Sequence, residues 1–439
     1  MTLRVFLTSL LLVTMSWATT CYAEILSLED AVQMALSNHQ RILQAGELYS
    51  ASSASAEAAA RERLPSIDFS FSYDRLNDNP FQSIAGSSLT VSDKDQVHYQ
   101  IRIKQPLFTG FHLSIQKKLA ELNVDIARYN LQQARRILAL DVHVAALQLL
   151  QSEALQRLAN QQCAQLKSHL ADIRAAYEQG MVPGNDRLKA EVALAAANQQ
   201  LRSITNRVTL IRSKLNLLLN LPQQDPLTII EPQAISQPQQ SLQQLTATAL
   251  EKRPEILSAK TAIASANEKI QLSHSNDYPH LALVASYWRD GNNLTASHNS
   301  YTNRDNAAIG IHLDWNLFSG GADRARRVAS QHEKRAKQQA LFELEDLVRL
   351  QVEEAFNQLD VAAHNEKTAA KALVQAQENH RLSILQFHEN IISTSDLLTA
   401  QTLQTRADVN LQTAHYGYLL AAAQLSFSLG QNPALKGEK

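Results

Sequence analysis

Glycine and proline, the residues that most often interrupt secondary structure, are scarce in this chain. Twelve glycines and eleven prolines in 439 residues are far below the ordinary usage of about 7% and 5%. Alanine, leucine and glutamine abound instead. Such a composition predicts a mainly α-helical protein with long helices.

Long hydrophobic runs and an excess of charge of one sign are also absent. After Glu24 no stretch approaches the roughly 20 consecutive apolar residues that a membrane-spanning helix needs. This excludes a helical membrane protein and leaves a barrel or an anchor as the ways to meet a membrane. The 41 basic and 42 acidic residues nearly balance, so no basic field exists to attract nucleic acid, and nucleic-acid binding is excluded.

Motifs that carry catalysis or bind metals are missing as well. The sequence has no GxSxG, P-loop or GxGxxG motif and no cysteine-rich metal spacing. Its 14 histidines are scattered, and His380 and His388, for example, stand two helical turns apart, too far for one metal ion. We therefore expect no enzyme activity, no cofactor and no metal site.

The N-terminus has the features of a signal peptide. A charged start precedes an apolar stretch too short to span a bilayer, and a small-residue site follows. Cleavage before Glu24 would make residues 1–23 the signal peptide and leave Cys163 as the sole cysteine, so packing and not a disulfide must stabilise the fold. Lipidation of Cys21 as an anchor stays open as the alternative, although the residues before it match a lipobox poorly.

One pattern occurs twice and covers nearly the whole mature chain. It divides the chain into a first repeat, 24–222, a linker, 223–241, a second repeat, 242–431, and a tail, 432–439. Equivalent residues lie 214 positions apart early in the repeat and 210 positions apart later, so the first copy has four extra residues in a loop. Each copy reads helix, strand, loop, strand, very long helix, tight turn, helix.

The very long helices follow Gly110 and Gly321. Each segment runs for about 70 residues without glycine or proline, which corresponds to about 100 Å of helix. Apolar residues spaced by threes and fours, such as Leu119, Ile137 and Leu140, predict one buried stripe. No globular core encloses helices of that length, so we expect them to pack side by side as coiled coils.

Four segments, 66–75, 96–104, 281–288 and 307–315, are predicted to be strands. Apolar and polar residues alternate with period two in most of them, which is typical of a transmembrane β-barrel with an outward apolar band. Four strands cannot close a barrel, and open edges in lipid are forbidden, so the chain must oligomerise. Three copies would give twelve strands around a lumen, whereas the eight strands of two copies would enclose side chains only.

Together these features resemble the TolC-like family of outer-membrane efflux proteins. The resemblance rests on their repeated order and on Leu64-Pro65 and Tyr278-Pro279 before strands, Gln105 to Gly110 and Leu317 to Gly321 after them, and tip turns ending in Asp-x-Leu-x-Ala and Asp-Leu-Leu-x-Ala. It implies a homotrimer whose barrel crosses the outer-membrane lipid of a Gram-negative bacterium and whose helical barrel extends into the periplasm. It also implies docking onto a periplasmic adaptor and an inner-membrane transporter, with this chain as a passive exit duct.

The two hairpin turns carry the candidate site residues. Asp186 and Asp396 are interpreted as helix N-terminal charges, with Asn185 or Ser395 as N-cap, and as candidates for acidic rings of a tip gate. In the family a tip aspartate lies where Asp396 lies, but the rest of the family's charged latch is only partly present. Contact with the adaptor or pump is assigned to Gly180, Met181, Val182, Pro183, Asn390, Ile391 and Ile392, with internal packing of the tip as the alternative.

Three glycines, Gly110, Gly320 and Gly321, are predicted to form the corners where a strand turns into a helix. A periplasmic adaptor or coiled-coil scaffold remains the alternative function; adaptors have one long hairpin flanked by compact β domains, whereas this sequence predicts two hairpins. The cargo, whether drug, metal ion or protein, stays open, because the pump selects it.

Overall fold

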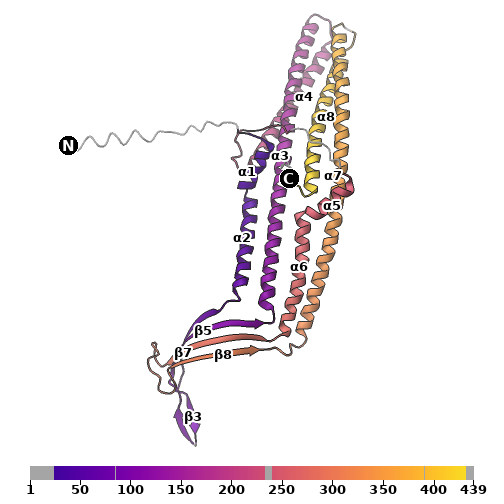
Figure 1. Cartoon of the computed structure of the whole chain (residues 1–439). Helices are drawn as coiled ribbons and strands as arrows, with labels where there is room; N and C mark the ends of the chain where they lie inside the picture. The colour runs from indigo at the N-terminus through magenta and orange to yellow at the C-terminus, as the bar shows by residue number, and fades with distance from the viewer. Residues whose placement is uncertain (1–23, 85, 233–239, 390, 432–439) are drawn as a thin grey trace, which may run out of the picture. The chain divides into compact units, whose positions relative to one another are not determined.

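The computed structural model describes residues 24–84, 86–232, 240–389 and 391–431 (Figure 1). The predicted signal peptide, 1–23, and the predicted tail, 432–439, lie outside these ranges. The chain divides into two compact units, and each contains pieces from both halves of the sequence. Unit 1 comprises the residues up to Leu43, Ala134–Lys252 and the residues from Val348, and unit 2 comprises Gln44–Gln133 and Arg253–Leu347.

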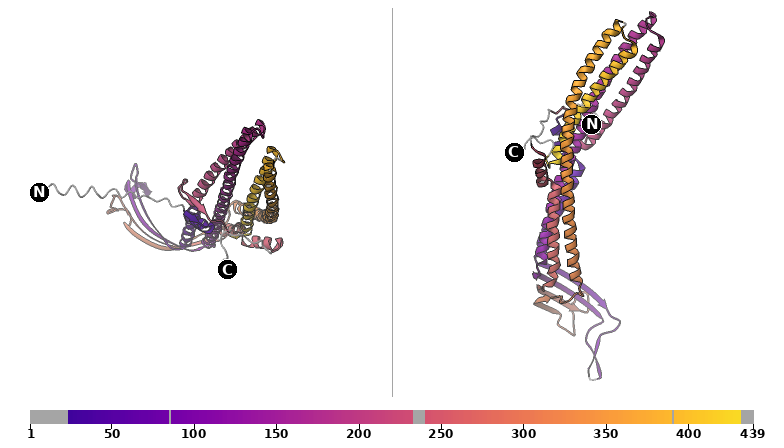
Figure 2. Two further views of the ribbon diagram at one scale, coloured as in Figure 1. Left: turned by 90° about the horizontal axis from the view of Figure 1, so that it is seen from above. Right: turned by 90° about the vertical axis from the view of Figure 1, so that its right-hand side faces the viewer.

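A curved antiparallel sheet of four strands lies at one end of the helices of unit 2 (Figures 1 and 2). Its order is β2-β5-β7-β8, so β2 and β8 form its edges. The four predicted strands are confirmed; β2 has the predicted bounds, and β5 and β7 run further than expected. The strands are β2 (Ser66–Arg75), β5 (Asp95–Thr109), β7 (His280–Gly291) and β8 (Asp305–Asp314).

Unit 2 also contains helices and a short β-hairpin. The helices α2 (Gln40–Arg61) and α6 (Pro254–His274), the latter followed by the short η1 (Ser275–Asp277), precede the first strand of each half. The segment between β2 and β5, which the repeat pattern predicted to be a loop, contains the hairpin of β3 (Phe81–Ile84) and β4 (Ser87–Thr90). Its Phe81 and Leu89 are exposed.

Two helical hairpins, whose long helices enter unit 1 at Ala134 and Val348, make up most of that unit and lie side by side there (Figures 1 and 2). α3 (His112–Glu178) turns back as α4 (Gly184–Leu219), and α7 (Ala322–His388) turns back as α8 (Thr394–Ser428). The two very long helices predicted from the sequence are confirmed, since α3 and α7 each run for 67 residues. No helix in the described ranges is long and apolar enough to cross a membrane. The smaller helices are α1 (Leu28–Asn38) and α5 (Leu242–Lys252).

A parallel strand pair attaches the linker between the repeats to unit 1. β1 (Glu24–Leu26) pairs with β6 (Leu227–Ile229). The buried Asn216 near the end of α4 also holds the linker, because its Nδ2 donates to the carbonyl oxygens of Pro222 at 3.2 Å and Asp225 at 3.0 Å. The sequence of the linker predicted neither contact.

The middle of α3 is buried on more sides than one stripe allows. Leu138, Val142 and Leu149 have no exposed surface, nor do three alanines of this stretch, Ala139, Ala145 and Ala146. Ile137, which the sequence pattern placed in the buried stripe, is 37% exposed, so that prediction is wrong. The pattern considered only large apolar residues, whereas alanine lets neighbouring helices approach closely and so determines which face is covered.

The two faces of the sheet differ in polarity. The register places Phe69, Ile101 and Tyr287 on one face, next to a row that includes Ile67, Ile103 and Ile309. These large side chains are exposed in the single chain. Asp68 and Arg102 lie on the opposite face with Ser286. The period-two alternation predicted from the sequence is therefore confirmed, and the apolar face needs a cover that the described residues do not supply.

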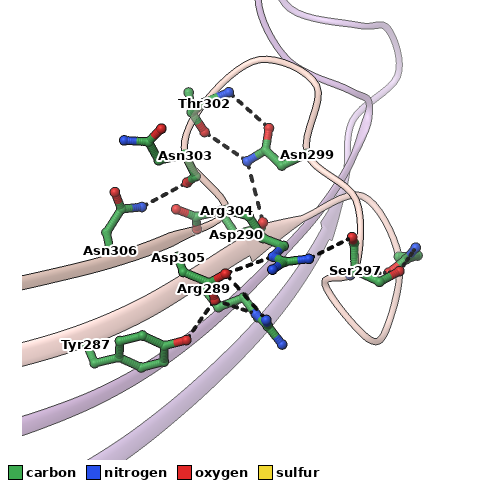
Figure 3. A network of polar contacts seen from close by, with 11 residues as sticks. Tyr287, Arg289, Asp290, Ser297, Asn299, Thr302, Asn303, Arg304, Asp305 and Asn306 are labelled. Carbon is green, nitrogen blue, oxygen red and sulfur yellow. Dashed lines mark hydrogen bonds and ion pairs between the residues drawn. The ribbon is translucent and has the colours of Figure 1, made fainter.

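Polar contacts join β7 to β8 at the end of the hairpin away from the helices (Figure 3). The hydroxyl of Tyr287 donates to Asp305 Oδ1 at 2.7 Å, and Arg289 Nε donates to the same oxygen at 2.7 Å. Arg304 Nε donates to the other carboxylate oxygen at 2.8 Å. One carboxylate thus accepts hydrogen bonds from three side chains, two of them on the opposite strand and one on the residue before it.

The first hairpin contains the same arrangement. The hydroxyl of Tyr73 donates to Asp95 Oδ1 at 2.8 Å, and Arg75 Nη1 lies 3.7 Å from that oxygen. Tyr73 and Arg75 lie 214 positions before their counterparts in the second hairpin, and Asp95 lies 210 positions before its counterpart. Residues 214 and 210 positions apart, which the sequence identified as equivalent, therefore make equivalent side-chain contacts. The bounds assigned to the two repeats remain a prediction.

Candidate channel wall and hairpin ends

The polar face of the sheet forms a concave surface with a different charge at each end. Near the helices it is lined by basic and acidic groups: Glu62, Arg102, Lys104, His280, His312 and Asp314. Near the loops the lining is acidic, with Asp74, Asp93 and Asp290. In the described ranges no group of three His, Cys, Asp or Glu residues could hold a metal ion. Such a surface can line an aqueous path but shows no arrangement for catalysis.

The predicted corner glycines all have left-handed backbone angles. Gly110, between β5 and α3, has φ +59°, and Gly320 and Gly321, before α7, have φ +65° and +84°. Only Gly110 is also crowded, since a Cβ there would lie 2.4 Å from the carbonyl oxygen of Ser275. The backbone conformation and, at Gly110, the lack of space both require glycine.

The turn between α3 and α4 combines exposed and packed residues. Gly180 has φ +73°, and Met181 is 66% exposed. Val182 packs against Leu170, Ile173 and Ala190, as does Phe387 from α7. Val182 therefore packs inside the tip, whereas the side chain of Met181 is exposed and can contact a partner.

Asp186 lies within the first turn of α4. Its Oδ1 accepts a hydrogen bond from Lys189 Nζ at 3.0 Å, which offsets its charge. The helix N-cap is Pro183, without a side-chain hydrogen bond, so the expectation that Asn185 caps this helix is wrong. Asn185 cannot cap it because Asn185 is already helical.

In the turn between α7 and α8, a capping box begins α8. Ser393, and not Ser395 as expected, is the N-cap of α8. Its hydroxyl donates to Asp396 Oδ2 at 2.7 Å, and its backbone N–H donates to the same oxygen at 3.1 Å. These hydrogen bonds lower the pKa of the Asp396 carboxyl, which keeps it charged. Ile391 is 70% exposed and Ile392 is partly buried, whereas Asn390 lies outside the described residues.

A polar layer that the sequence analysis missed joins three helices in the tip half of unit 1. The rings of His169 on α3 and His380 on α7 meet edge to face with centroids 6.3 Å apart. His380 is 6% exposed. On α8, Gln401 donates from Nε2 to Gln165 of α3 at 3.5 Å. The available signal was the spacing of four between residues 165 and 169, which places both polar side chains on one helix face.

A second polar cluster, which the sequence analysis also missed, joins the linker to the helices α7 and α8. His415 Nδ1 lies 2.7 Å from Glu366 Oε1, and its Nε2 lies 3.5 Å from Glu231 Oε1. Tyr416 also donates to Glu231, at 3.2 Å. Burial, and then the charge of Glu231, raise the pKa of Tyr416 to about 12, so its hydroxyl stays protonated as a donor. This cluster is a structural attachment of the linker.

Comparison with known proteins places both halves of the chain in one family. The sequence model of the family "Outer membrane efflux protein" matches residues 31–221 and 245–431. The alkaline protease secretion protein AprF of Pseudomonas aeruginosa is 29% identical over 191 residues, which are 42% of this chain and 37% of that protein. The outer membrane efflux protein BepC of Brucella suis is 24% identical over 334 residues, 74% of this chain and 72% of that protein.

The fold is also that of solved membrane proteins. A crystal structure of a membrane protein from Pseudomonas aeruginosa superposes with a TM-score of 0.80 at 17% identity, covering 92% of this chain and 90% of that one. The internal repeat, the alternating sheet and the two long hairpins agree with this likeness. Because the family matches in both repeats, this protein belongs to the outer membrane efflux protein family, the channel proteins of tripartite efflux and type I secretion systems.

Proposed function

We propose that the chain forms a homotrimeric exit duct in the outer membrane, a passive conduit driven by an inner-membrane transporter through a periplasmic adaptor. The carrying observation is the sheet, which leaves β2 and β8 paired on one side only and leaves one apolar face exposed. Unpaired strand edges in lipid cost several kcal/mol for each backbone group, so edges must meet other copies. Three sheets of four strands would enclose a lumen, with the polar face lining it.

The test is the mass of the detergent-extracted protein by light scattering, followed by conductance in planar bilayers. We expect three chains for each particle and a conducting pore. A monomer or dimer that is released with soluble periplasmic proteins would support the scaffold alternative instead.

The cargo is open between two classes. AprF is named for the secretion of a protease, and BepC is named for efflux. Since the aligned part spans 37% of the first of these relatives and 72% of the second, neither name fixes the cargo of this chain.

Asp396 is proposed to contribute an acidic ring at the tip of the trimer. The lowered pKa keeps this carboxylate charged, whereas Lys189 offsets the charge of Asp186. We expect Asp396→Asn to lower the cation-to-anion permeability ratio several-fold and Asp186→Asn to change it less. Bilayer reversal potentials measure both.

Ser393→Ala provides the matched control for Asp396→Asn. It breaks the same capping box, at a cost of about 1 kcal/mol, but keeps the carboxylate. Equal permeability changes in Ser393→Ala and Asp396→Asn would mean that the cap, and not the charge, controls selectivity.

Adaptor contact is proposed for the exposed apolar residues of the two turns. Met181 and Ile391 are 66% and 70% exposed, beyond what internal packing of the tip requires. An aspartate there would have to be desolvated against an apolar partner surface. We expect Met181→Asp with Ile391→Asp to lower export at least tenfold in the native host while the trimer forms normally. The neighbouring exposed Ser395→Asp is the control, and loss of the trimer in the double variant would instead assign these residues to tip packing.

A further inference from the structure

The internal repeat identifies a strand pair that the single chain lacks. β5 is the second strand of the first repeat, and β7 is the first strand of the second repeat, so the pair β5–β7 joins the end of one repeat to the start of the next. β8 is the second strand of the second repeat. Its equivalent partner is the first strand of a first repeat, which is β2. Within one chain, β2 and β8 are opposite edges three strand spacings apart, roughly 14 Å, so they cannot pair with each other.

The repeat is regular enough to transfer a register. In the first hairpin Ser66 lies opposite Lys104, and at the same place in the second hairpin His280 lies opposite Asp314. The other end agrees, because the pair of Arg75 with Asp95 becomes the pair of Arg289 with Asp305. Every pair between these ends follows the same separations, 214 positions for the first strand and 210 for the second.

The register of the missing β8–β2 pair follows from that of β5–β7: adding 210 to a residue of β5 gives its equivalent in β8, and subtracting 214 from a residue of β7 gives its equivalent in β2. Ile101 lies opposite Tyr287, and Ile103 lies opposite Ala285. We infer that β8 of one copy pairs with β2 of the next copy so that Ile311 lies opposite Tyr73 and Leu313 lies opposite Phe71 of the neighbouring copy. The inference rests on the proposed function, because it assumes that copies join edge to edge, but it does not depend on the number of copies.

Across this contact between β8 of one copy and β2 of the next, which we call the seam, the apolar and the polar face of the sheet both continue. Ile311 and Leu313 belong to the exposed apolar row of β8, and Tyr73 and Phe71 belong to that of β2. On the polar face, the register places His312 opposite Ser72 of the neighbouring copy. A shift by one residue would turn every apolar side chain of one strand to the polar face.

Two side-chain observations favour this register over a shift by two residues, which would preserve the faces. The Ile–Tyr pair formed within the chain by Ile101 and Tyr287 recurs across the seam as Ile311 with Tyr73, as expected where a repeat conserves its cross-strand contacts. Phe318, 85% exposed, comes opposite Ile67, 72% exposed, just as Phe108 lies opposite Leu281 within the chain. The seam thus covers the most exposed phenylalanine at the corner.

Disulfide cross-linking tests the register. In a Cys163→Ser background, the pairs Leu313→Cys with Phe71→Cys, on the apolar face, and His312→Cys with Ser72→Cys, on the polar face, are oxidised in outer membranes with copper phenanthroline. Residues directly opposite in an antiparallel pair have Cα atoms about 4.5–5.5 Å apart, within the range that a disulfide bridges. We expect covalent multimers of the chain on non-reducing gels, and none from the single-cysteine variants.

Pairs shifted by two residues are the matched controls: Leu313→Cys with Phe69→Cys and Leu313→Cys with Tyr73→Cys. Their Cα atoms would be about 8 Å apart, beyond disulfide reach, so we expect at least tenfold less cross-linked product. Stronger cross-linking of a shifted pair, or none at all in a particle that light scattering identifies as a trimer, would overturn the register and leave the proposed function standing. A monomer by light scattering would overturn the proposed function itself. The polar-face pair keeps the test valid if the apolar-face variants fail to assemble, since Ser72 and His312 are not packed in the single chain.

Discussion

Gly110→Ala should remove most of the folded protein from the outer membrane. An added Cβ would lie 2.4 Å from the carbonyl oxygen of Ser275 and 2.9 Å from Cβ of Tyr278, and the residue would have to keep φ +59°. The left-handed conformation alone costs an L-residue about 1–2 kcal/mol. A clash with backbone adds to this because η1 cannot move without disturbing α6 and β7 on either side of it. Against a total stability of about 5–15 kcal/mol, we expect a large loss of folded protein, measured by membrane fractionation and thermal unfolding.

Gly320→Ala separates the two causes. Gly320 has a similar φ, +65°, but nothing lies within 4 Å of its ideal Cβ. We expect only the conformational cost of about 1–2 kcal/mol there. Gly417→Ala, inside α8 and also without a near neighbour, should be neutral or stabilise by about 1 kcal/mol. If Gly110→Ala and Gly320→Ala lose the same amount of folded protein, the close approach of η1 to the first corner does not matter.

Acidification should destabilise the tip half of unit 1 through the histidine pair. Burial lowers the pKa of both His169 and His380 below the ordinary value of 6.5. For His169, the charge of protonated His380 and that of His388 lower the pKa further, and Asp172 opposes them. Protonation of both rings would place two positive charges at the contact between α3 and α7, where His380 is 6% exposed.

The sign follows from proton binding. Each imidazole binds its proton less readily in the folded chain than in the unfolded chain, so the unfolded state takes up more protons as the pH falls below about 6.5. The free energy of unfolding is therefore at its full value above that pH and decreases as the pH drops towards the folded-state pKa values. We expect the melting temperature to fall between pH 7.5 and pH 5.

Glutamine variants identify the source of this loss. His169→Gln with His380→Gln removes both titrating rings but retains polar side chains that fit a layer already containing Gln165 and Gln401. The drop in melting temperature between the two pH values should be smaller in this variant than in the wild type. His364→Gln, at a position on α7 that is 72% exposed, should leave the drop unchanged. An unchanged drop in the double variant would assign the acid sensitivity to other groups.

Elements with strong periodicity were predictable from the sequence. The alternation of residues 66–75 gave the bounds of β2, and the absence of breakers gave α3 and α7. Both signals are local, because each residue type prefers its place on a strand or helix whatever lies around it. The repeat added the topology, since two copies with fixed separations imply two equivalent hairpins.

Sequence patterns failed to predict three kinds of feature: the choice between two N-cap residues, very short strands, and contacts between distant segments. Ser395 and Ser393 are both acceptable N-caps, and Ser393 is used because Asp396 three residues later completes the capping box. β3, β4 and β6 are three to four residues long, too short for a periodic signal. The contact of His169 with His380 joins residues more than 200 positions apart, and nothing in either neighbourhood of the sequence indicates the other.

We could therefore predict the repeat, the four strands, the two long helices and, through them, the family from the order of the residues alone. Those features depend on periodicity and composition, which are recorded residue by residue along the chain. The folded chain was needed to show which face of α3 is buried, which glycine corner is crowded and which polar groups meet inside unit 1. Each of these depends on what another segment places against the residue, and packing and electrostatic energies arise from that contact.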